Sequence, residues 1–424
     1  MKTLKAIVIG AGNRGITYSH AMSKSEYDFQ VVAVAEPIES RRNYVKSLFN
    51  IPDEMCFTDY KDLLELGKIA DIAVIATMDR DHFAPAIKAI ELKYDLLLEK
   101  PIAPTPEECI AITRSAEENG VKVLICTVLR YTQIYNTIKS IIDEGKLGKI
   151  MSMDMEERVG GVHQSHSFVR GNWGNSERSS VMLLQKSCHD LDLFQWLLGK
   201  KCKSIQSFGA LSFFTRENAP EGAPEYCIEG CPHSDTCRFN AVKLYLDDKK
   251  NEWFRGACTH KYQPNDEDVI KAITETQYGK CVYKCDNDVV DHQTVNMLFE
   301  DDITVTFTMN AFNSGGRTFR IFGTKGLLEG SFGGDNPISL YNFETRETEI
   351  VPLLAIDGVA GGHGGGDMGI VNTMYSYFVD GVKPVNIPDI AQSCYNHLIT
   401  FAAEESRLTN TVVDVEKFIK KYSK

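Results

Sequence analysis

The sequence lacks the long hydrophobic runs that membrane insertion or export would require. No segment offers the roughly 18 apolar residues of a membrane-spanning helix. The first apolar run, residues 6–9, is too short for a signal peptide and ends in a glycine loop. We therefore expect a cytoplasmic protein with no membrane partner.

Positive charge is also scarce. The 424 residues include 46 Lys and Arg against 58 Asp and Glu, which gives a formal net charge of −12. Lysine pairs occur at 200–201 and 420–421, but each is short and isolated. Because nucleic acids are bound through basic patches, we expect no nucleic-acid partner.

Internal repeats and low-complexity segments are absent too, and the composition is that of a globular protein. The chain is 43% hydrophobic and 25% charged, which excludes a disordered or fibrous protein. Twelve cysteines are many for this length. In a reducing cytoplasm, cysteines are usually buried thiols, metal ligands or redox groups rather than structural disulfides.

The first third of the chain alternates short apolar runs with amphipathic stretches. Runs of the strand type occupy residues 6–9, 31–35, 71–76, 95–98 and 123–129. Helical patterns lie between them, and this order is typical of a parallel, doubly wound α/β sheet. We therefore predict a Rossmann domain over residues 1–128.

The pattern changes after this point, and residues 129–424 predict an α+β domain with a large, mostly antiparallel open sheet. Strand patterns at 289–299 and 303–312 are joined by Glu300-Asp301-Asp302, which predicts a hairpin. Two helical patterns, 367–381 and 390–408, close the chain. A cysteine-bearing insertion with little helical or strand pattern occupies about 215–262.

A glycine motif follows the first predicted strand. Residues 10–15 read Gly-Ala-Gly-Asn-Arg-Gly, so Gly10, Gly12 and Gly15 form a G-x-G-x-x-G at the start of a helix. Such a loop lets the backbone approach a pyrophosphate, which the helix N-terminus then stabilises. Glu36 ends the second strand and can accept hydrogen bonds from a ribose, which favours NAD over NADP. The alternative is a turn without a ligand.

Glu99-Lys100-Pro101 stands at the end of the fifth predicted strand. Together with the glycine motif it resembles the glucose-fructose oxidoreductase, inositol dehydrogenase and MocA (Gfo/Idh/MocA) family. The resemblance implies that Lys100 reaches the nicotinamide and a substrate hydroxyl. It also implies a homodimer or homotetramer formed through the exposed sheet face. The candidate cofactor contacts are Gly10, Gly12, Asn13, Arg14, Gly15, Glu36, Thr77, Glu99 and Lys100.

A second signature begins at Gln185. The family usually shows Asp-x-x-x-His here, and the resemblance implies that His189 is the general base. Gln185 stands at the aspartate position, and an amide cannot stabilise an imidazolium as a carboxylate does. We expect the neighbouring Lys186 to take part of that role.

Polar and aromatic residues on predicted loops are candidates for substrate contact. Residues 160–178 mix histidine, arginine and tryptophan, which suits a polyol but equally a surface lid. A glycine-rich stretch at 361–367 encloses one further histidine. The candidate substrate contacts are Arg130, His163, Trp173, Gln185 and His363.

Three cysteines crowd into the insertion. Cys227, Cys231 and Cys237 predict a structural zinc site that needs a fourth ligand from Cys258, Cys281 or His233. An iron–sulfur cluster is a variant of this hypothesis. Free thiols or a redox disulfide are the alternative.

These features lead to one main functional hypothesis and two alternatives. The main one is an NAD-dependent oxidoreductase that acts on a secondary hydroxyl of a sugar, sugar derivative or cyclitol. The first alternative is an NAD-dependent glycosidase that oxidises its substrate transiently and then eliminates the aglycone. The second is a nucleotide-binding regulatory protein without catalysis.

Overall fold

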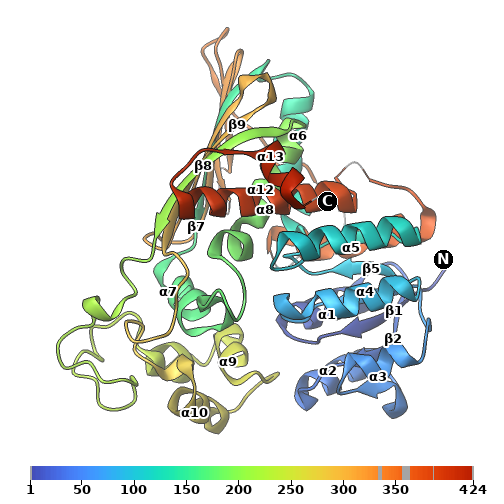
Figure 1. Ribbon diagram of the computed structural model, residues 1–424, viewed down its shortest axis with the longest axis vertical. Helices are drawn as coiled ribbons and strands as arrows, with labels where there is room; N and C mark the ends of the chain where they lie inside the picture. The colour runs from blue at the N-terminus through green and yellow to red at the C-terminus, as the bar shows by residue number, and fades with distance from the viewer. Residues whose placement is uncertain (1, 333–336, 356–362, 385, 423–424) are drawn as a thin grey trace.

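A parallel sheet of six strands organises the N-terminal part of the protein (Figure 1). The computed structural model describes residues 2–332, 337–355, 363–384 and 386–422. The strand order β3-β2-β1-β4-β5-β6 is that of a Rossmann fold, as predicted. The strands are β1 (Leu4–Ile9), β2 (Phe29–Ala35), β3 (Cys56–Phe57), β4 (Ile72–Ile75), β5 (Asp95–Leu98) and β6 (Val123–Ile125).

Helices cover both faces of this sheet, which explains why its strands are continuous apolar runs. Local signals fix some of their ends: Thr105 caps α5 by accepting a hydrogen bond from the Glu108 amide, and Gly120 ends it in a left-handed conformation. The helices are α1 (Asn13–Lys24), α2 (Glu39–Phe49), α3 (Tyr60–Glu65), α4 (Phe83–Glu91) and α5 (Pro106–Asn119).

A second sheet of nine strands forms the upper part of the molecule in Figure 1. Its order is β14-β13-β12-β11-β7-β10-β9-β8-β15, and only β7 and β10 pair in parallel. The predicted hairpin is confirmed, because β9 and β10 pair antiparallel across Glu300–Asp302. The strands are β7 (Ile150–Arg158), β8 (Cys202–Ala210), β9 (His292–Phe299), β10 (Thr304–Asn310), β11 (Gly316–Gly323), β12 (Gly326–Phe332), β13 (Ile338–Asn342), β14 (Thr348–Ile350) and β15 (Val413–Asp414).

Helices of the second half pack on both sheets. Ile370 and Met374 of α11 belong to the core of the Rossmann sheet, and Cys394 and Leu398 of α12 pack on its other face. The C-terminal helices therefore complete the N-terminal core. Bounds are α6 (Gln133–Asp143), α7 (Gly161–Ser165), α8 (Met182–Leu198), α11 (Gly366–Tyr375), α12 (Ile390–Thr409) and α13 (Val415–Tyr422), with a π-helix, η4 (His166–Arg170), after α7.

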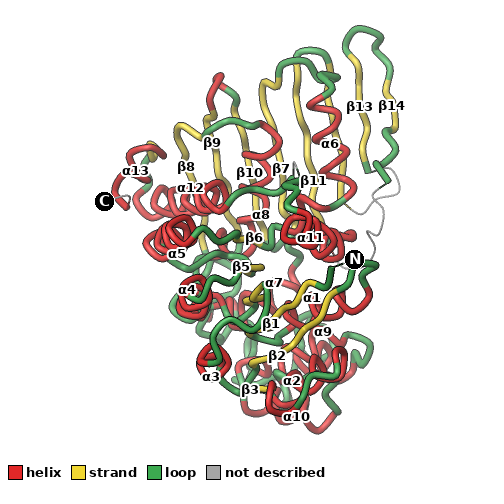
Figure 2. Tube along the Cα trace, turned by 90° about the vertical axis from the view of Figure 1, so that its right-hand side faces the viewer, coloured by secondary structure: helices red, strands yellow, loops and turns green. Residues whose placement is uncertain are grey.

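The segment between β8 and β9 forms a separate lobe, which we call the insertion lobe (residues 211–291). The expectation of little helix over about 215–262 is wrong, because this stretch contains a π-helix, η7 (Val242–Asp247), and α9 (Glu252–Thr259). A further helix of the lobe, α10 (Asp266–Glu275), follows it. The apolar faces of these helices bury a small core of their own around Tyr245 and Phe254. The lobe lies beside α2 at the lower end of the molecule (Figure 2). Over the described part of the chain, no helix is long and apolar enough to cross a bilayer.

Candidate functional site

The glycine loop between β1 and α1 has the geometry that a pyrophosphate requires. A Cβ at Gly10 would lie 2.7 Å from the carbonyl carbon of Ala76, and one at Gly15 would lie 2.0 Å from the Gly10 oxygen. These two glycines therefore allow the backbone to pack. A Cβ at Gly12 would meet only the Arg41 guanidinium, at 3.8 Å. The space in front of Gly12 is thus a cradle that a dinucleotide fits.

Glu36 stands where a ribose would bind. Its carboxylate accepts hydrogen bonds from the amides of Ala11 (2.7 Å) and Ile38 (2.9 Å), which fix its orientation at the end of β2. Arg42 donates to the Glu36 carbonyl oxygen rather than extending toward a 2′-phosphate. This arrangement fits NAD.

Arg14 connects the cofactor loop to the rest of the protein. Its guanidinium pairs with Glu99 at 2.7 Å and with Asp367 of α11 at 2.6 Å. Tyr18 also donates a hydrogen bond to Glu99. Burial would raise the pKa of Glu99, but the charges of Arg14 and Lys100 outweigh it and hold that pKa below its usual value. Glu99 is therefore an ionised anchor for the loop that carries Lys100.

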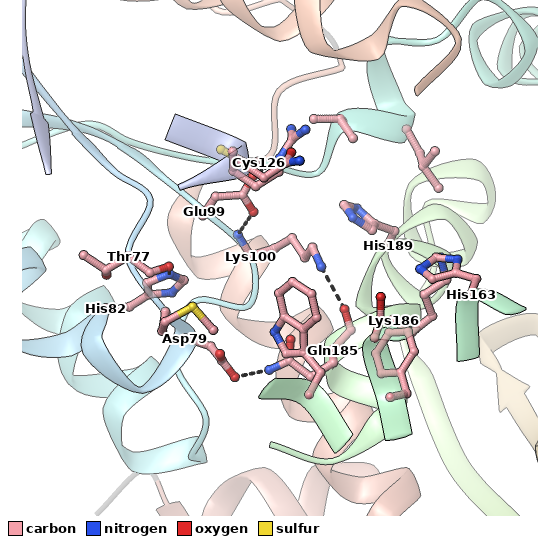
Figure 3. A pocket seen from close by; sticks show the side chains of 18 of the residues that line it. Thr77, Asp79, His82, Glu99, Lys100, Cys126, His163, Gln185, Lys186 and His189 are labelled. Carbon is pink, nitrogen blue, oxygen red and sulfur yellow. Dashed lines mark hydrogen bonds and ion pairs between the residues drawn. The ribbon is translucent and has the colours of Figure 1, made fainter. Parts of the chain in front are cut away.

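A cavity of about 460 Å³ opens beyond the carboxyl ends of β4 and β5, between the Rossmann sheet and α8 (Figure 3). Ligands of open parallel sheets bind at this edge. Its lining comprises Asn13, Arg14, Thr77, Met78, Asp79, His82, Glu99, Lys100, Cys126, Val128, Leu129, His163, Ser167, Phe168, Trp173, Gln185, Lys186, His189, Trp253 and Arg317.

The two sequence signatures meet in this cavity. The Lys100 ammonium donates a hydrogen bond of 2.8 Å to the carbonyl oxygen of Gln185, which aims the side chain across the cavity toward α8 (Figure 3). His189 lies one helical turn after Gln185 on α8 and lines the same cavity. A cation and an imidazole therefore face the same space.

A carboxylate that the sequence signatures do not indicate holds the side chain of Gln185. Asp79, just after β4, accepts hydrogen bonds from the Gln185 amide and from the Ser179 hydroxyl, the latter at 2.8 Å. It is 3% exposed, and its other oxygen, Oδ1, has no partner in the described part of the chain. The signal that could have found it is its position after a strand end.

Lys186, which lines the cavity, belongs to a network of two cations and two carboxylates. Its ammonium lies 3.3 Å from Glu157, and Arg317 pairs with both Glu157 (2.6 Å) and Asp190 (2.7 Å). Burial lowers the pKa of Lys186, against the opposing effect of Glu157. Burial likewise raises the pKa of Asp190 against the opposing charge of Arg317. This network brings positive charge to the cavity wall.

Aromatic side chains also line the cavity. Phe168 and Trp173 contact each other at 6.2 Å between ring centroids, and Trp253 of the insertion lobe meets the His163 ring edge-on at 5.1 Å. Burial holds the pKa of His163 well below its ordinary value, aided by the charge of Lys186, so its imidazole is neutral at pH 7. Trp253 lies outside every sequence motif, because it reaches the cavity from the insertion lobe.

One predicted substrate contact, Arg130, does not line the cavity, and a second, His363, stays a prediction. Arg130 is 1% exposed and forms a two-pronged ion pair with Asp192, at 2.6 and 2.9 Å, so its prediction as a substrate contact is corrected to a buried structural role. His363 begins a short 3₁₀ turn, but its side chain lies outside the described part of the structure.

The predicted zinc site is not supported. Among the described residues, no three His, Cys, Asp or Glu side chains are arranged to hold one metal ion. Cys258 lies in the apolar core of the insertion lobe, and the His233 ring contacts the Glu221 carbonyl oxygen at 2.8 Å. Spacing alone placed these thiols near one another but could not fix the distances among them.

The Rossmann sheet, the glycine cradle and the cavity beyond the strand ends define an NAD-binding oxidoreductase. The family models agree: "oxidoreductase family, NAD-binding Rossmann fold" matches residues 4–127, and "oxidoreductase family, C-terminal alpha/beta domain" matches residues 139–415. The chain belongs to the Gfo/Idh/MocA family of oxidoreductases.

Individual relatives are distant. The oxidoreductase YteT of Bacillus subtilis (strain 168) is 23% identical over 320 residues, which are 73% of this chain and 72% of YteT. Inositol 2-dehydrogenase of Salmonella typhimurium is 25% identical over 207 residues, which are 49% of this chain and 58% of that enzyme. Levoglucosan dehydrogenase, solved with NADH and L-sorbose, has the same fold with a TM-score of 0.71 and 18% identity, over 98% of this chain and 99% of that one.

Substitution of Gly12 separates cofactor binding from folding. In Gly12→Val, the new Cβ meets no protein backbone, so the melting temperature is expected to change little while the Kd for NAD rises more than about tenfold. Thermal unfolding and fluorescence titration measure the two effects. Gly15→Ala is the contrasting variant, because its Cβ collides with the Gly10 oxygen and lowers the melting temperature. Equal NAD affinity in Gly12→Val and the parent protein would contradict the cradle.

Proposed function

We propose that the protein is an NAD-dependent oxidoreductase acting on a secondary hydroxyl of a sugar, sugar derivative or cyclitol. The observation that carries the proposal is the pairing of Lys100 and His189 in one cavity that also receives Asn13 and Arg14 of the cofactor loop. The lining combines aromatic rings with polar groups, which suit the apolar faces and hydroxyls of a polyol. The names of inositol 2-dehydrogenase and levoglucosan dehydrogenase support this substrate class.

Each residue of the cavity has its own role in the proposed reaction. Lys100 donates hydrogen bonds to the substrate oxygen and stabilises negative charge that develops on it. His189 takes the hydroxyl proton. Asp79 holds the Gln185 amide, and through it the stretch of α8 that sets Lys100. Bound NAD supplies the hydride acceptor, and the protein aligns the carbon that gives up the hydride.

The test is turnover with a defined panel. The purified protein is incubated with NAD and a series of cyclitols, sugars and aryl glycosides, while absorbance follows NADH and chromatography follows released aglycone. NADH formation with one or more polyols, lost in His189→Ala, is the expected result. Neither NADH nor aglycone across the whole panel would refute the proposed chemistry.

The second candidate function is an NAD-dependent glycosidase. It follows from the insertion lobe, which closes over the adenosine side of the cofactor site. The Tyr262 ring stacks on Tyr44 of α2 at 3.9 Å, and the Tyr262 amide donates to the Ser40 hydroxyl at 3.2 Å. Burial lowers the pKa of Arg41, and the neighbouring Glu36 and Tyr278 oppose this effect. A cofactor held in this way exchanges slowly, which suits a glycosidase that returns the hydride after eliminating the aglycone.

Removal of the Tyr262 ring tests this closure. Tyr262→Ala deletes an aromatic pair of about 1 kcal/mol, so NAD is expected to dissociate about fivefold faster. Stopped-flow displacement of bound NADH measures the rate. Tyr262→Phe keeps the ring and should behave as the parent protein does. An unchanged dissociation rate in Tyr262→Ala would contradict the closure.

The open face of the nine-stranded sheet supports the proposed homo-oligomer. Met151 and Phe208 are about half exposed on β7 and β8. Acidic, basic and threonine side chains surround a shallow hollow on β7, β10 and β11, including Asp154, Thr306 and Arg320. Mixed polar and apolar surfaces of this kind form interfaces between subunits.

A further inference from the structure

The chain segment that carries Lys100 contacts the C-terminal helix α12. The backbone amide of Ile102, two residues after Lys100, donates a hydrogen bond of 3.1 Å to Nε2 of His397. The other ring nitrogen of His397, Nδ1, lies 2.8 Å from the carbonyl oxygen of Ser393, one turn earlier on α12. His397 is 1% exposed, belongs to no sequence motif and is separated from Ile102 by 295 positions. A histidine from the second half of the chain therefore holds the Lys100 segment.

The two contacts of His397 define the protonation state of its ring. The Ile102 amide can only donate, so Nε2 carries no proton, and the backbone carbonyl oxygen of α12 can only accept, so Nδ1 carries one. Burial lowers the pKa of His397 to about 4. Lys100 and His82 add to this effect, while the backbone carbonyl and Asp192 oppose it. The imidazole is therefore neutral at pH 7 and serves Ile102 as a hydrogen-bond acceptor.

This acceptor completes a set of contacts along the Lys100 segment. Other elements hold the start of the segment, through the carboxylate of Glu99 and through the His82 ring, whose Nδ1 lies 2.8 Å from the Pro101 carbonyl oxygen. Ile102 is fully buried, so water cannot replace the imidazole as the partner of its amide. Loss of the imidazole therefore leaves a buried donor unpaired two residues from Lys100.

The same helix also holds α8, which carries His189. The side-chain amide of Asn396, the residue before His397, donates a hydrogen bond of 2.5 Å to Asp192 of α8. Asp192 follows His189 by three positions, about one turn, on that helix. Adjacent residues of α12 thus bind the Lys100 segment on one side and the helix of His189 on the other. The position of α12 therefore sets how these two side chains face each other.

We propose that His397 is a positioning residue, which holds the Lys100 segment so that the ammonium stays opposite His189. This inference rests on the proposed function, in which Lys100 and His189 act on one hydroxyl. A displacement of about 1 Å in such a site can cost about 10²-fold in rate. His397 is not among the described residues that line the cavity, so it acts through Lys100 and not on the substrate.

Substitution by leucine and by glutamine separates the hydrogen bond from packing. Leucine cannot accept from the Ile102 amide, so His397→Leu is expected to lower kcat about 10- to 100-fold and to change the Kd for NAD much less. Glutamine offers an oxygen to Ile102 and an amide to the Ser393 carbonyl, so His397→Gln is expected to recover most of the lost kcat. Thr400→Val is the matched control, because Thr400 is also buried on α12 and its hydroxyl donates to the Asn396 carbonyl oxygen of the same helix. It should keep the kcat of the parent protein.

Two further measurements on the full-length protein need no substrate. In nitrogen NMR of the parent protein labelled at histidine, the resonances that His397→Gln removes should be those of a neutral ring with its proton on Nδ1, between about pH 6 and 8. In hydrogen–deuterium exchange followed by mass spectrometry, the peptide that contains Ile102 should exchange at least about tenfold faster in His397→Leu. In His397→Gln it should exchange as slowly as in the parent protein.

These outcomes distinguish the inference from the proposed reaction. A protein that turns over no member of the substrate panel refutes the reaction, while the resonances and exchange rates still decide the contact of His397 with Ile102. An imidazolium, a proton on Nε2, or unchanged exchange in His397→Leu would overturn the inference even where turnover is seen. So would a kcat of His397→Leu within about threefold of the parent, or a His397→Gln variant as slow as His397→Leu. The NMR result needs only the parent and the glutamine variant, so misfolding of His397→Leu does not protect the inference.

Discussion

Replacement of Lys100 by methionine is expected to lower kcat about 10³-fold, with little change in the affinity for NAD. Methionine matches the length of the stem but removes the ammonium that faces the cavity and the hydrogen bond to the Gln185 carbonyl oxygen. In the proposed reaction this ammonium stabilises charge that develops only as the hydroxyl proton leaves. The loss should therefore fall on kcat more than on KM.

The measurement is steady-state kinetics on the substrate that the panel identifies, with an NAD titration on the same sample. Lys88→Met provides the matched control, because Lys88 lies on the exposed face of α4 and makes only a surface ion pair with Glu91. It should keep full activity. A Lys100→Met enzyme within threefold of the parent would contradict the assigned role.

The effects of the Lys100 and His189 substitutions on activity should not be additive. Because both serve the same transfer of proton and charge, the double variant Lys100→Met/His189→Ala is expected to lose far less than the product of the single effects.

The parts of the site that sequence could predict are those that depend on local backbone. Gly15 is required by a contact within the first βα turn, where a Cβ would strike the Gly10 oxygen, and Gly10 has a positive φ of 85° that favours glycine. Lys100 is set by a strand end, and strand ends follow from apolar runs. The order of strands then brings β1, β4 and β5 together, so the cofactor loop and Lys100 share one edge of the sheet.

The parts that sequence missed depend on contacts between distant segments. Asp79 and Gln185 are separated by 106 positions, and neither residue type indicates that one would bind the other. Trp253 reaches the cavity from the insertion lobe, whose packing against the cavity wall no motif describes. Arg130 was expected to contact substrate, but its side chain pairs instead with Asp192 of α8 in the core.

The C-terminal helices show the same limit at the level of domains. Composition and pattern favour two consecutive domains, yet α11 and α12 return to cover both faces of the first sheet. A Rossmann fragment cut from the chain would expose these apolar faces. The cofactor site and the second sheet are therefore parts of one cooperative structure, joined also by the ion pair of Arg14 with Asp367.

Replacement of Arg130 by methionine is expected to destabilise the protein by about 3–5 kcal/mol. Arg130 lies in η3 (Val128–Tyr131), which joins the two halves of the chain, and Asp192 lies on α8 of the second half. Removal of the guanidinium leaves the Asp192 carboxylate buried, and among the described residues the Asn396 amide is its one remaining hydrogen-bond donor. Urea denaturation, followed by circular dichroism, measures the change in the midpoint.

The same reasoning predicts that a second substitution restores stability. In Arg130→Met/Asp192→Leu the buried carboxylate is gone as well, so the double variant should be more stable than Arg130→Met alone, because two apolar side chains of similar volume replace the pair. Lys139→Met is the surface control: it breaks an exposed ion pair with Asp143 and should cost less than about 1 kcal/mol. If the double variant were less stable than Arg130→Met, the penalty would come from lost packing of Asp192 rather than from its unpaired charge.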